Sequence, residues 1–113
     1  MHSKKLLIEH SRGVELVPLE AIIYCEADDN WTRVVLADNT CFKICQTLKA
    51  IEGRIDDDAF LRVHRSYLIN FIHVTKVQGN YEGLYLTDDQ IVPVSRRKRP
   101  LVRMALKQIL NCI

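Results

Sequence analysis

Basic side chains are concentrated near the C-terminus. From Gln90 to Ile113 the chain has no aspartate or glutamate, and it carries six cations: Arg96, Arg97, Lys98, Arg99, Arg103 and Lys107. The net charge of the whole chain is only +2, but a polyanion responds to local potential more than to total charge. Guanidinium groups and helix N-termini both bind phosphate. The segment therefore predicts a nucleic-acid partner.

Ser95 and the basic residues after it predict the start of a helix. Ser95 can act as the N-cap, and Arg96–Arg99 would form the first turn. Cations at this end oppose the helix dipole by about a few tenths of a kcal/mol each. Several of them are better accommodated when an anion binds there. The alternative is a capped helix whose basic first turn is only solvated.

The central segment Phe60–Asn70, FLRVHRSYLIN, holds a second candidate site. If His64 ends one strand and Tyr67 begins the next, Arg65 and Ser66 form a tight turn with a guanidinium at its tip. Such an arginine can make paired hydrogen bonds to guanine. The alternative is a solvated arginine on a hairpin. We expect His64 to order the turn through a hydrogen bond, and Tyr67 to lie in the core.

No arrangement of residues points to catalysis or to a cofactor. The four histidines form no local Ser/His/Asp or Cys/His pattern, and the four glycines are scattered singly. Cys41 and Cys45 form a C-x3-C pair with no second pair of Cys or His nearby. We expect small strand side chains there, with zinc binding and thiol redox sensing as less favoured alternatives. We therefore predict that the chain is not an enzyme and that it binds neither a cofactor nor a metal ion.

The composition is that of an ordinary globular domain. The 113 residues are 48% hydrophobic and 27% charged, which predicts one domain over residues 1–113. No apolar run approaches the ~18 residues needed to cross a bilayer, and the N-terminus lacks the features of a secretion signal. We therefore expect no membrane association and a cytoplasmic location. The cysteines, expected there to be reduced thiols, are Cys25, Cys41, Cys45 and Cys112.

Short apolar runs separated by turn residues predict a mostly β protein with minor α content. Thr47 is expected to cap a short helix, because apolar residues follow it at helical spacing over 48–55. Residues 101–110 have a period near 3.6 and predict an amphipathic C-terminal helix. The predicted strands are Lys5–Ile8, Val14–Pro18, Ala21–Ala27, Trp31–Leu36, Thr40–Cys45, Phe60–His64, Tyr67–Asn70, Val74–Gln78, Tyr81–Leu86 and Ile91–Val94.

Four segments, taken together, resemble the LytTR DNA-binding domain. They are Ile22–Thr32 (IIYCEADDNWT), Thr47–Ile51 (TLKAI), Phe60–Asn70 (FLRVHRSYLIN) and Val92–Arg97 (VPVSRR). The resemblance extends from about residue 5 to about residue 110. Its most specific part is HRSY followed by an asparagine, with VSRR downstream. This family supplies the output domains of bacterial response regulators of the LytR/AlgR type.

The resemblance implies stacked small antiparallel sheets with one short helix and a C-terminal helix. It also implies sequence-specific binding of double-stranded DNA for transcription regulation. In such domains three segments enter successive grooves on one face of the duplex and bend it. Carried onto this chain, the implied DNA-binding residues are Asn30, Trp31, Arg33, His64, Arg65, Ser66, Arg96, Arg97, Lys98 and Arg99.

The chemistry of these side chains suggests a division of roles. Arg65 and Arg97 can read base edges, each contact being worth ~1–3 kcal/mol of discrimination. The remaining polar side chains of the set suit phosphates, which fix register without specifying sequence; they are Arg33, Ser66, Lys98 and Arg99. Bending of the duplex would add readout at bases that are never touched.

The sequence departs from the family pattern at three places. Pro100 fits best in a first helical turn, so the last helix is predicted to begin near Lys98. Asp28 and Asp29 place two carboxylates beside a loop expected to face DNA, and they must turn away from phosphates. Trp31 stands where the family often has tyrosine or histidine, and it is expected in the core or, alternatively, in contact with a sugar or base.

The family context leaves two arrangements open. Such domains usually follow a phosphorylatable receiver domain, for which 113 residues leave no room. The chain is then either a stand-alone regulator or the output portion of a longer protein with an N-terminal receiver. The resemblance also implies paired binding on adjacent direct-repeat sites. The alternative function is a β interaction module whose basic face binds an acidic protein partner or RNA.

Overall fold

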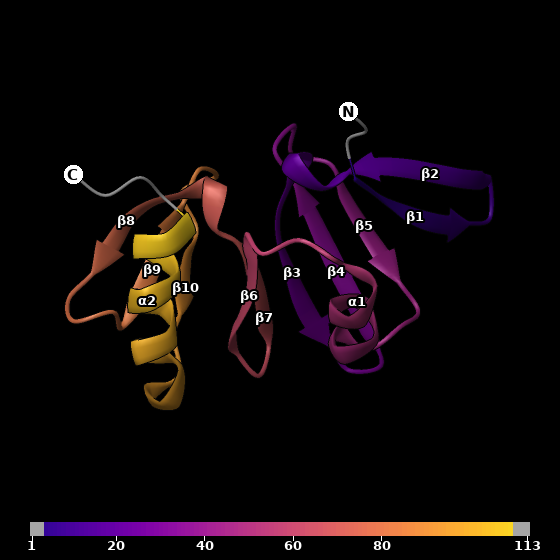
Figure 1. The fold of residues 1–113 in the computed structure, drawn as a ribbon. Coiled ribbons are helices and arrows are strands. Elements are labelled where there is room, and N and C mark those ends of the chain that lie inside the picture. The colour runs from indigo at the N-terminus through magenta and orange to yellow at the C-terminus, as the bar shows by residue number, and fades with distance from the viewer. Residues whose placement is uncertain (1–3, 110–113) are drawn as a thin grey trace.

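The computed structural model describes residues 4–109 and shows strands arranged in three antiparallel sheets (Figure 1). The strand order is β5-β4-β3-β7-β6 in the five-stranded sheet, β10-β9-β8 in the three-stranded sheet and β1-β2 in the two-stranded sheet. These sheets and two α-helices confirm the predicted fold class. The strands are β1 (Lys5–His10), β2 (Gly13–Pro18), β3 (Ile22–Asp28), β4 (Trp31–Leu36), β5 (Cys41–Ile44), β6 (Phe60–His64), β7 (Tyr67–Asn70), β8 (Val74–Gln78), β9 (Gly83–Leu86) and β10 (Ile91–Pro93); the helices are α1 (Leu48–Arg54) and α2 (Arg99–Ile109), with short 3-10 turns η1 (Leu19–Ala21), η2 (Phe71–His73) and η3 (Arg96–Lys98).

The five-stranded sheet is the middle layer, because a separate core covers each of its faces. One core joins the sheet to β1, β2 and α1, and the other joins it to the three-stranded sheet and α2. Strand β3 contributes to both cores. Ile22 and Cys25 lie in the first core, whereas Ile23 and Tyr24 lie in the second. The pairing of β3 with β4 shifts register between Ile22 and Tyr24. This irregularity lets the consecutive side chains of Ile23 and Tyr24 face the same core.

The helices begin and end as their sequences suggest. The Thr47 hydroxyl accepts a hydrogen bond from Ala50 N at 3.2 Å, and Leu48 and Ile51 are buried beneath it, which confirms the predicted cap. Pro100 lies in the first turn of α2, which begins at Arg99, one residue after the predicted start. Neither α1 nor α2, the helices of residues 4–109, has the length and apolar composition of a membrane-spanning segment.

Several predicted strand boundaries differ from the structure by one or two residues, among them the starts of β3 and β9. Ala21 belongs to η1, and β3 begins one residue later. Tyr81 adopts a left-handed φ of 62° in the turn between β8 and β9, so β9 begins at Gly83. This conformation is rare for a residue with a Cβ atom, and the apolar pattern around Tyr81 therefore gave no indication of it.

The side chain of Asn70, at the end of β7, forms hydrogen bonds to the segment where η1 meets β3. Its side chain is 1% exposed, and its amide nitrogen donates to Leu19 O at 3.2 Å and Ile22 O at 2.9 Å. Its carbonyl oxygen accepts from Ile72 N at 3.3 Å. A buried amide that makes all these hydrogen bonds stabilises the fold. If the amide were removed, the two main-chain carbonyls and the main-chain N–H that it binds would stay buried without a partner.

Replacing Asn70 by alanine should lower the free energy of unfolding by about 3 kcal/mol, on the order of 1 kcal/mol for each buried hydrogen bond lost. Urea unfolding followed by circular dichroism measures the change. Asn80→Ala is the matched control, because Asn80 is exposed and its replacement should stay within about 0.5 kcal/mol. Equal stability of the two variants would show that the Asn70 contacts contribute nothing net.

Candidate nucleic-acid interface

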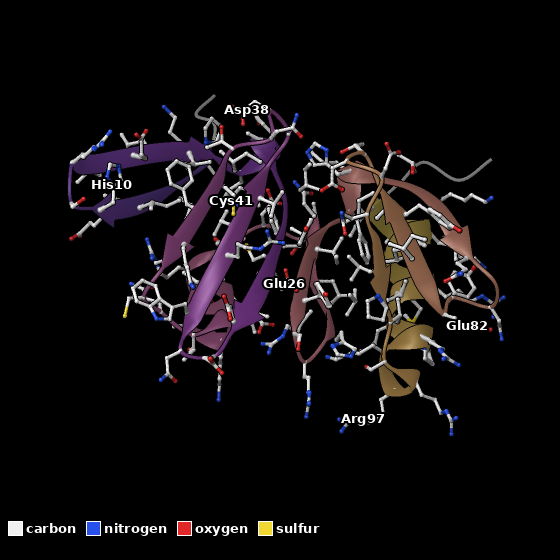
Figure 2. The ribbon with its side chains drawn as sticks, turned by 180° about the vertical axis from the view of Figure 1, so that it is seen from behind. His10, Glu26, Asp38, Cys41, Glu82 and Arg97 are labelled. Atoms are coloured by element: carbon white, nitrogen blue, oxygen red, sulfur yellow. The ribbon has the colours of Figure 1, made fainter. Side chains whose placement is uncertain are left out.

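The three segments implied by the family resemblance lie along one edge of the molecule. The β3–β4 turn, the β6–β7 turn and η3 all lie at the bottom in Figure 1. Figure 2 shows Arg97 at this edge, whereas Glu26 lies higher, between the two halves of the protein. We call residues 29–31, 64–66 and 95–99 the basic edge. Segments far apart in the sequence thus lie along one edge of the molecule.

Main-chain hydrogen bonds connect the three parts of the basic edge. Ala27 N, near the end of β3, donates to Ser66 O in the β6–β7 turn at 2.9 Å. Ser95 N, just before η3, donates to Val63 O in β6 at 2.9 Å. The β6–β7 turn is therefore bonded to the segment on each side of it. These bonds hold the three segments in fixed relative positions.

The β6–β7 turn has the geometry predicted from the sequence. Strand β6 ends at His64 and β7 begins at Tyr67, so Arg65 and Ser66 form the turn. The imidazole Nδ1 of His64 accepts a hydrogen bond from Ser66 N at 3.1 Å. This confirms that His64 orders the turn. The guanidinium of Arg65 makes no hydrogen bond or ion pair within residues 4–109 and remains available at the tip.

Arg62 supports the same turn from within β6, a role that the sequence analysis missed. Its Nε donates to His64 O at 3.0 Å and its Nη2 donates to Arg65 O. Its Nη1 pairs with Glu52 of α1 at 3.0 Å. One guanidinium thus satisfies two carbonyls of the turn and is itself held by a carboxylate. The position of Glu52, which is distant in sequence, gave no local signal for this arrangement.

The start of the last helix differs in detail from the prediction. Residues 96–98 form the 3-10 turn η3, and α2 follows directly from it. Ser95 precedes η3, but its hydroxyl makes no capping hydrogen bond; its carbonyl accepts from Lys98 N at 2.9 Å instead. The prediction that the Ser95 side chain caps the helix was therefore wrong. A main-chain bond closes the turn in its place.

An open groove of about 450 Å³ separates the β6–β7 turn from η3. Arg62 and Arg65 line one side, and Arg96, Arg97 and Lys98 line the other. No carboxylate lines it. Five cations around one groove produce a positive potential that favours a polyanion.

Ion pairing distinguishes three basic side chains of the sheets from those at the edge and along α2. Away from the turn tips, Arg33, Lys43 and Arg62 pair with carboxylates at 2.9, 3.3 and 3.0 Å. In the part of the chain that the structure describes, no acidic partner or side-chain hydrogen bond is found for the cations at the edge and along α2: Arg65, Arg96, Arg97, Lys98, Arg99, Arg103 and Lys107. These side chains are therefore free to bind an external anion. Lys5, Arg12 and Lys49 also have no acidic partner among residues 4–109, but they lie apart from one another on β1, in the β1–β2 turn and on α1.

Arg33 lies on the sheet face behind the edge and is held by Glu26. Its Nη2 donates to Glu26 Oε1 at 2.9 Å and to the Tyr24 hydroxyl at 3.3 Å. The hydroxyl of Tyr67 donates to the other oxygen of Glu26 at 3.0 Å. The hydrogen bond to Glu26 raises the pKa of Arg33. A phosphate contact by Arg33 would therefore use the guanidinium nitrogens that Glu26 does not hold.

Trp31 is a surface residue, so the default expectation of a core aromatic was wrong. It begins β4 directly opposite Asp28, the last residue of β3, and is 41% exposed. The ammonium of Lys43 lies over its ring at 5.6 Å and also pairs with Asp28 at 3.3 Å. Asp28 is thus neutralised by Lys43. Asn30 is exposed in the turn beside it, where Asp29 adopts a φ of 54°.

The cysteines and histidines form no metal site among residues 4–109. Cys25 is buried in a sheet core, and burial raises the pKa of its thiol to about 12. Cys41 begins β5, as predicted for a strand side chain, whereas Cys45 follows the end of β5; both are exposed. Cys112 lies outside the described residues.

Replacing Arg62 by alanine should loosen the β6–β7 turn, because two carbonyls lose a charged donor. We expect faster amide hydrogen exchange at Ser66 and a loss of about 1–3 kcal/mol in the free energy of unfolding. Arg54→Ala is the control: Arg54 bonds to Gln46 and to Leu7 O, away from the turn. Unchanged exchange at Ser66 in the Arg62 variant would contradict the assigned role.

The phenols of Tyr24 and Tyr67 should ionise at a higher pH than an ordinary tyrosine, because the pKa of each is raised. Burial raises the pKa of Tyr24; burial and the hydrogen bond to Glu26 raise that of Tyr67. Unfolded tyrosine ionises near pH 10, so the two phenols stabilise the fold fully below about pH 10. That contribution is lost as pH rises through the higher folded values.

Near-ultraviolet absorbance of tyrosinate tests this assignment. Tyr67→Phe should remove one late-ionising group, and Glu26→Gln should move the Tyr67 transition to lower pH because the charge that opposes ionisation is gone. An identical titration in Glu26→Gln and the parent protein would argue against the contact.

The chain matches known proteins over most of its length. The family model for the LytTr DNA-binding domain matches residues 12–107. The CO-responsive transcriptional regulator RcoM of Rhodospirillum rubrum is 38% identical over 98 residues, covering 82% of this chain and 41% of the regulator. The sensory transduction protein LytT of Bacillus subtilis is 30% identical over 95 residues, covering 81% of this chain and 39% of LytT.

The fold also matches a solved structure. The LytTr DNA-binding domain of a Bacillus cereus protein superposes with a TM-score of 0.75 at 25% identity, covering 94% of this chain and 98% of that one. By contrast, the chain spans only about 40% of the length of the two regulators.

Proposed function

Because the chain belongs to the LytTR family of DNA-binding domains, we propose that its basic edge binds double-stranded DNA sequence-specifically and so regulates bacterial transcription. The observation that carries this proposal is the placement of the unpaired cations. Five of them, Arg65 and the four residues 96–99, lie on the β6–β7 turn and on the neighbouring η3 segment, which the hydrogen bond from Ser95 N to Val63 O joins along one edge. A polyanion with a regular charge spacing fits such a surface.

The contacts of each side chain support different roles within the edge. Arg65 and Arg97 have free guanidinium groups on exposed turns, which suits paired hydrogen bonds to base edges. Ser66, Lys98 and Arg99 sit beside them and suit phosphates, as does Arg96. His64 is engaged with Ser66 N and acts by shaping the turn.

The β3–β4 turn supplies the third segment of the interface. Asn30 and the exposed Trp31 are placed to contact sugars or bases at the other end of the edge. Arg33 stands behind them on β4, with its guanidinium held by Glu26. The ion pair between Lys43 and Asp28 reduces repulsion between this loop and phosphate.

The proposal extends to the setting of the domain. The relatives are more than twice as long as the matched region, which supports a larger regulator; we propose that a receiver domain precedes this one in it. Two such domains would then occupy adjacent direct repeats, with the link between receivers raising their effective concentration. A regulator that binds the chromosome would work in the cytoplasm. This domain contributes binding, not catalysis.

A selection from randomised duplexes, at about 150 mM salt, tests the proposed function. The purified domain should recover a motif, and a preferred duplex should bind ~10³-fold or more tightly than random DNA. No enrichment with folded protein would instead favour an acidic protein or RNA as partner of the basic edge.

Two single substitutions test the division of roles. Arg97→Ala should remove most of the preference for the selected motif, by a factor of about 10–100 at the base it contacts. Lys98→Ala should weaken all duplexes alike and lower the salt slope of binding by about 1. Competition binding at several salt concentrations measures both. If the two variants lose affinity equally for every duplex, the assignment of Arg97 to base readout is wrong.

A further inference from the structure

Helix α2 carries a row of cations that continues beyond the basic edge. Arg99, Arg103 and Lys107 follow one another at intervals of four residues, so they lie on one face of the helix. With a rise of 1.5 Å per residue, each step is about 6 Å and the row is about 12 Å long. Arg99 belongs to the basic edge, whereas Lys107 lies two helical turns away from it.

This face of α2 borders an open groove of about 420 Å³. Arg99, Arg103 and Lys107 line it together with Tyr81 in the turn between β8 and β9, and no carboxylate lines it. The Nε of Arg99 is buried and has no hydrogen-bond partner in the described chain. Arg103 and Lys107 are exposed and unpaired. The protein therefore leaves three charges along one groove without an internal anion.

The direction of α2 determines what these charges can reach. The helix starts at the basic edge and runs up the outer flank of the molecule, with its N-terminal end at the bottom in Figure 1. A straight duplex lying along the edge passes beside Arg99 and leaves Arg103 and Lys107 behind. A duplex that bends toward this flank meets all three.

We infer that this flank of α2 is a second phosphate-binding track, which holds DNA next to the recognition site in a bent path. The inference rests on the proposed function of the basic edge. Arg99 connects the two surfaces, so DNA bound at the edge already lies beside the first cation of the row. The contacts made along the row offset part of the elastic cost of bending.

Continuity favours DNA over an acidic protein segment as the anion at this track. From Gln90 onward the sequence has no acidic residue, so no repulsive charge from this segment interrupts the row between the edge and Lys107. DNA held by the edge is also present at high local concentration, whereas a separate protein would bind independently. If the track does not bind DNA, an acidic protein segment becomes the favoured ligand.

The test uses duplexes that extend the selected site in one direction at a time. The largest dimension of the molecule is 43 Å, so a duplex of about 13 base pairs spans the edge at about 3.4 Å per pair. Two longer duplexes add about 12 base pairs on the α2 side or on the opposite side. For the parent protein, only the α2-side extension should steepen the salt slope, by about 2, and only it should bend, as measured by fluorescence energy transfer between its ends.

The Arg103→Ala/Lys107→Ala variant should abolish both effects and still bind the short duplex like the parent, which shows that it is folded. Lys5→Ala/Arg12→Ala changes net charge equally on the distant β1–β2 hairpin and should retain both effects. Identical behaviour of the α2 variant and the parent on all duplexes would overturn the track and favour a protein partner. An equal loss on the short duplex would also overturn it, because the cations would then act at the edge itself. Failure of the parent to bind even the short duplex would overturn the proposed function.

Discussion

The backbone pairing on both sides of the β6–β7 hairpin is the constraint on which the rest of the interface depends. Ser66 O is bonded to β3, and Val63 O is bonded to the residue that precedes η3. These two bonds use main-chain atoms, so they do not depend on which side chains occupy the turn tips. Together with the pairing of β3 with β7, they restrict the movement of the three loops relative to one another, so that ordering the loops on a ligand costs less conformational entropy. With them, the protein presents its cations on a preformed surface.

The distribution of charge follows the same division between scaffold and surface. Carboxylates are used inside the scaffold, where Glu26 holds Arg33 and Glu52 holds Arg62. At the tips the cations have no such partners. A net charge of only +2 is therefore compatible with strong local potential, because most negative charge is kept away from the basic edge.

Local sequence patterns predicted most of the fold, because alternation and turn residues act over a few positions. The His64 turn and the Thr47 cap depend on neighbours two or three residues away, and both were predictable. The role of Arg62 was not, since it requires Glu52 from another element. The exposure of Trp31 was missed for a related reason: its place opposite Asp28, at the end of a sheet, depends on strand pairing. The order of strands and the joining of three segments into one edge likewise arise from contacts distant in sequence.

The free side chains at the turn tips have a consequence for how such a protein can diverge. Arg65 and Arg97 are exposed and make no side-chain hydrogen bond or ion pair among residues 4–109, so replacing either should change the stability of the fold by no more than about 0.5 kcal/mol. If these two residues read bases as proposed, a lineage can exchange them one at a time and acquire a new target sequence without passing through an unfolded intermediate. Arg62 and Asn70 have no such freedom, because each satisfies several groups of the scaffold. The fold separates the positions that can evolve quickly from those that cannot.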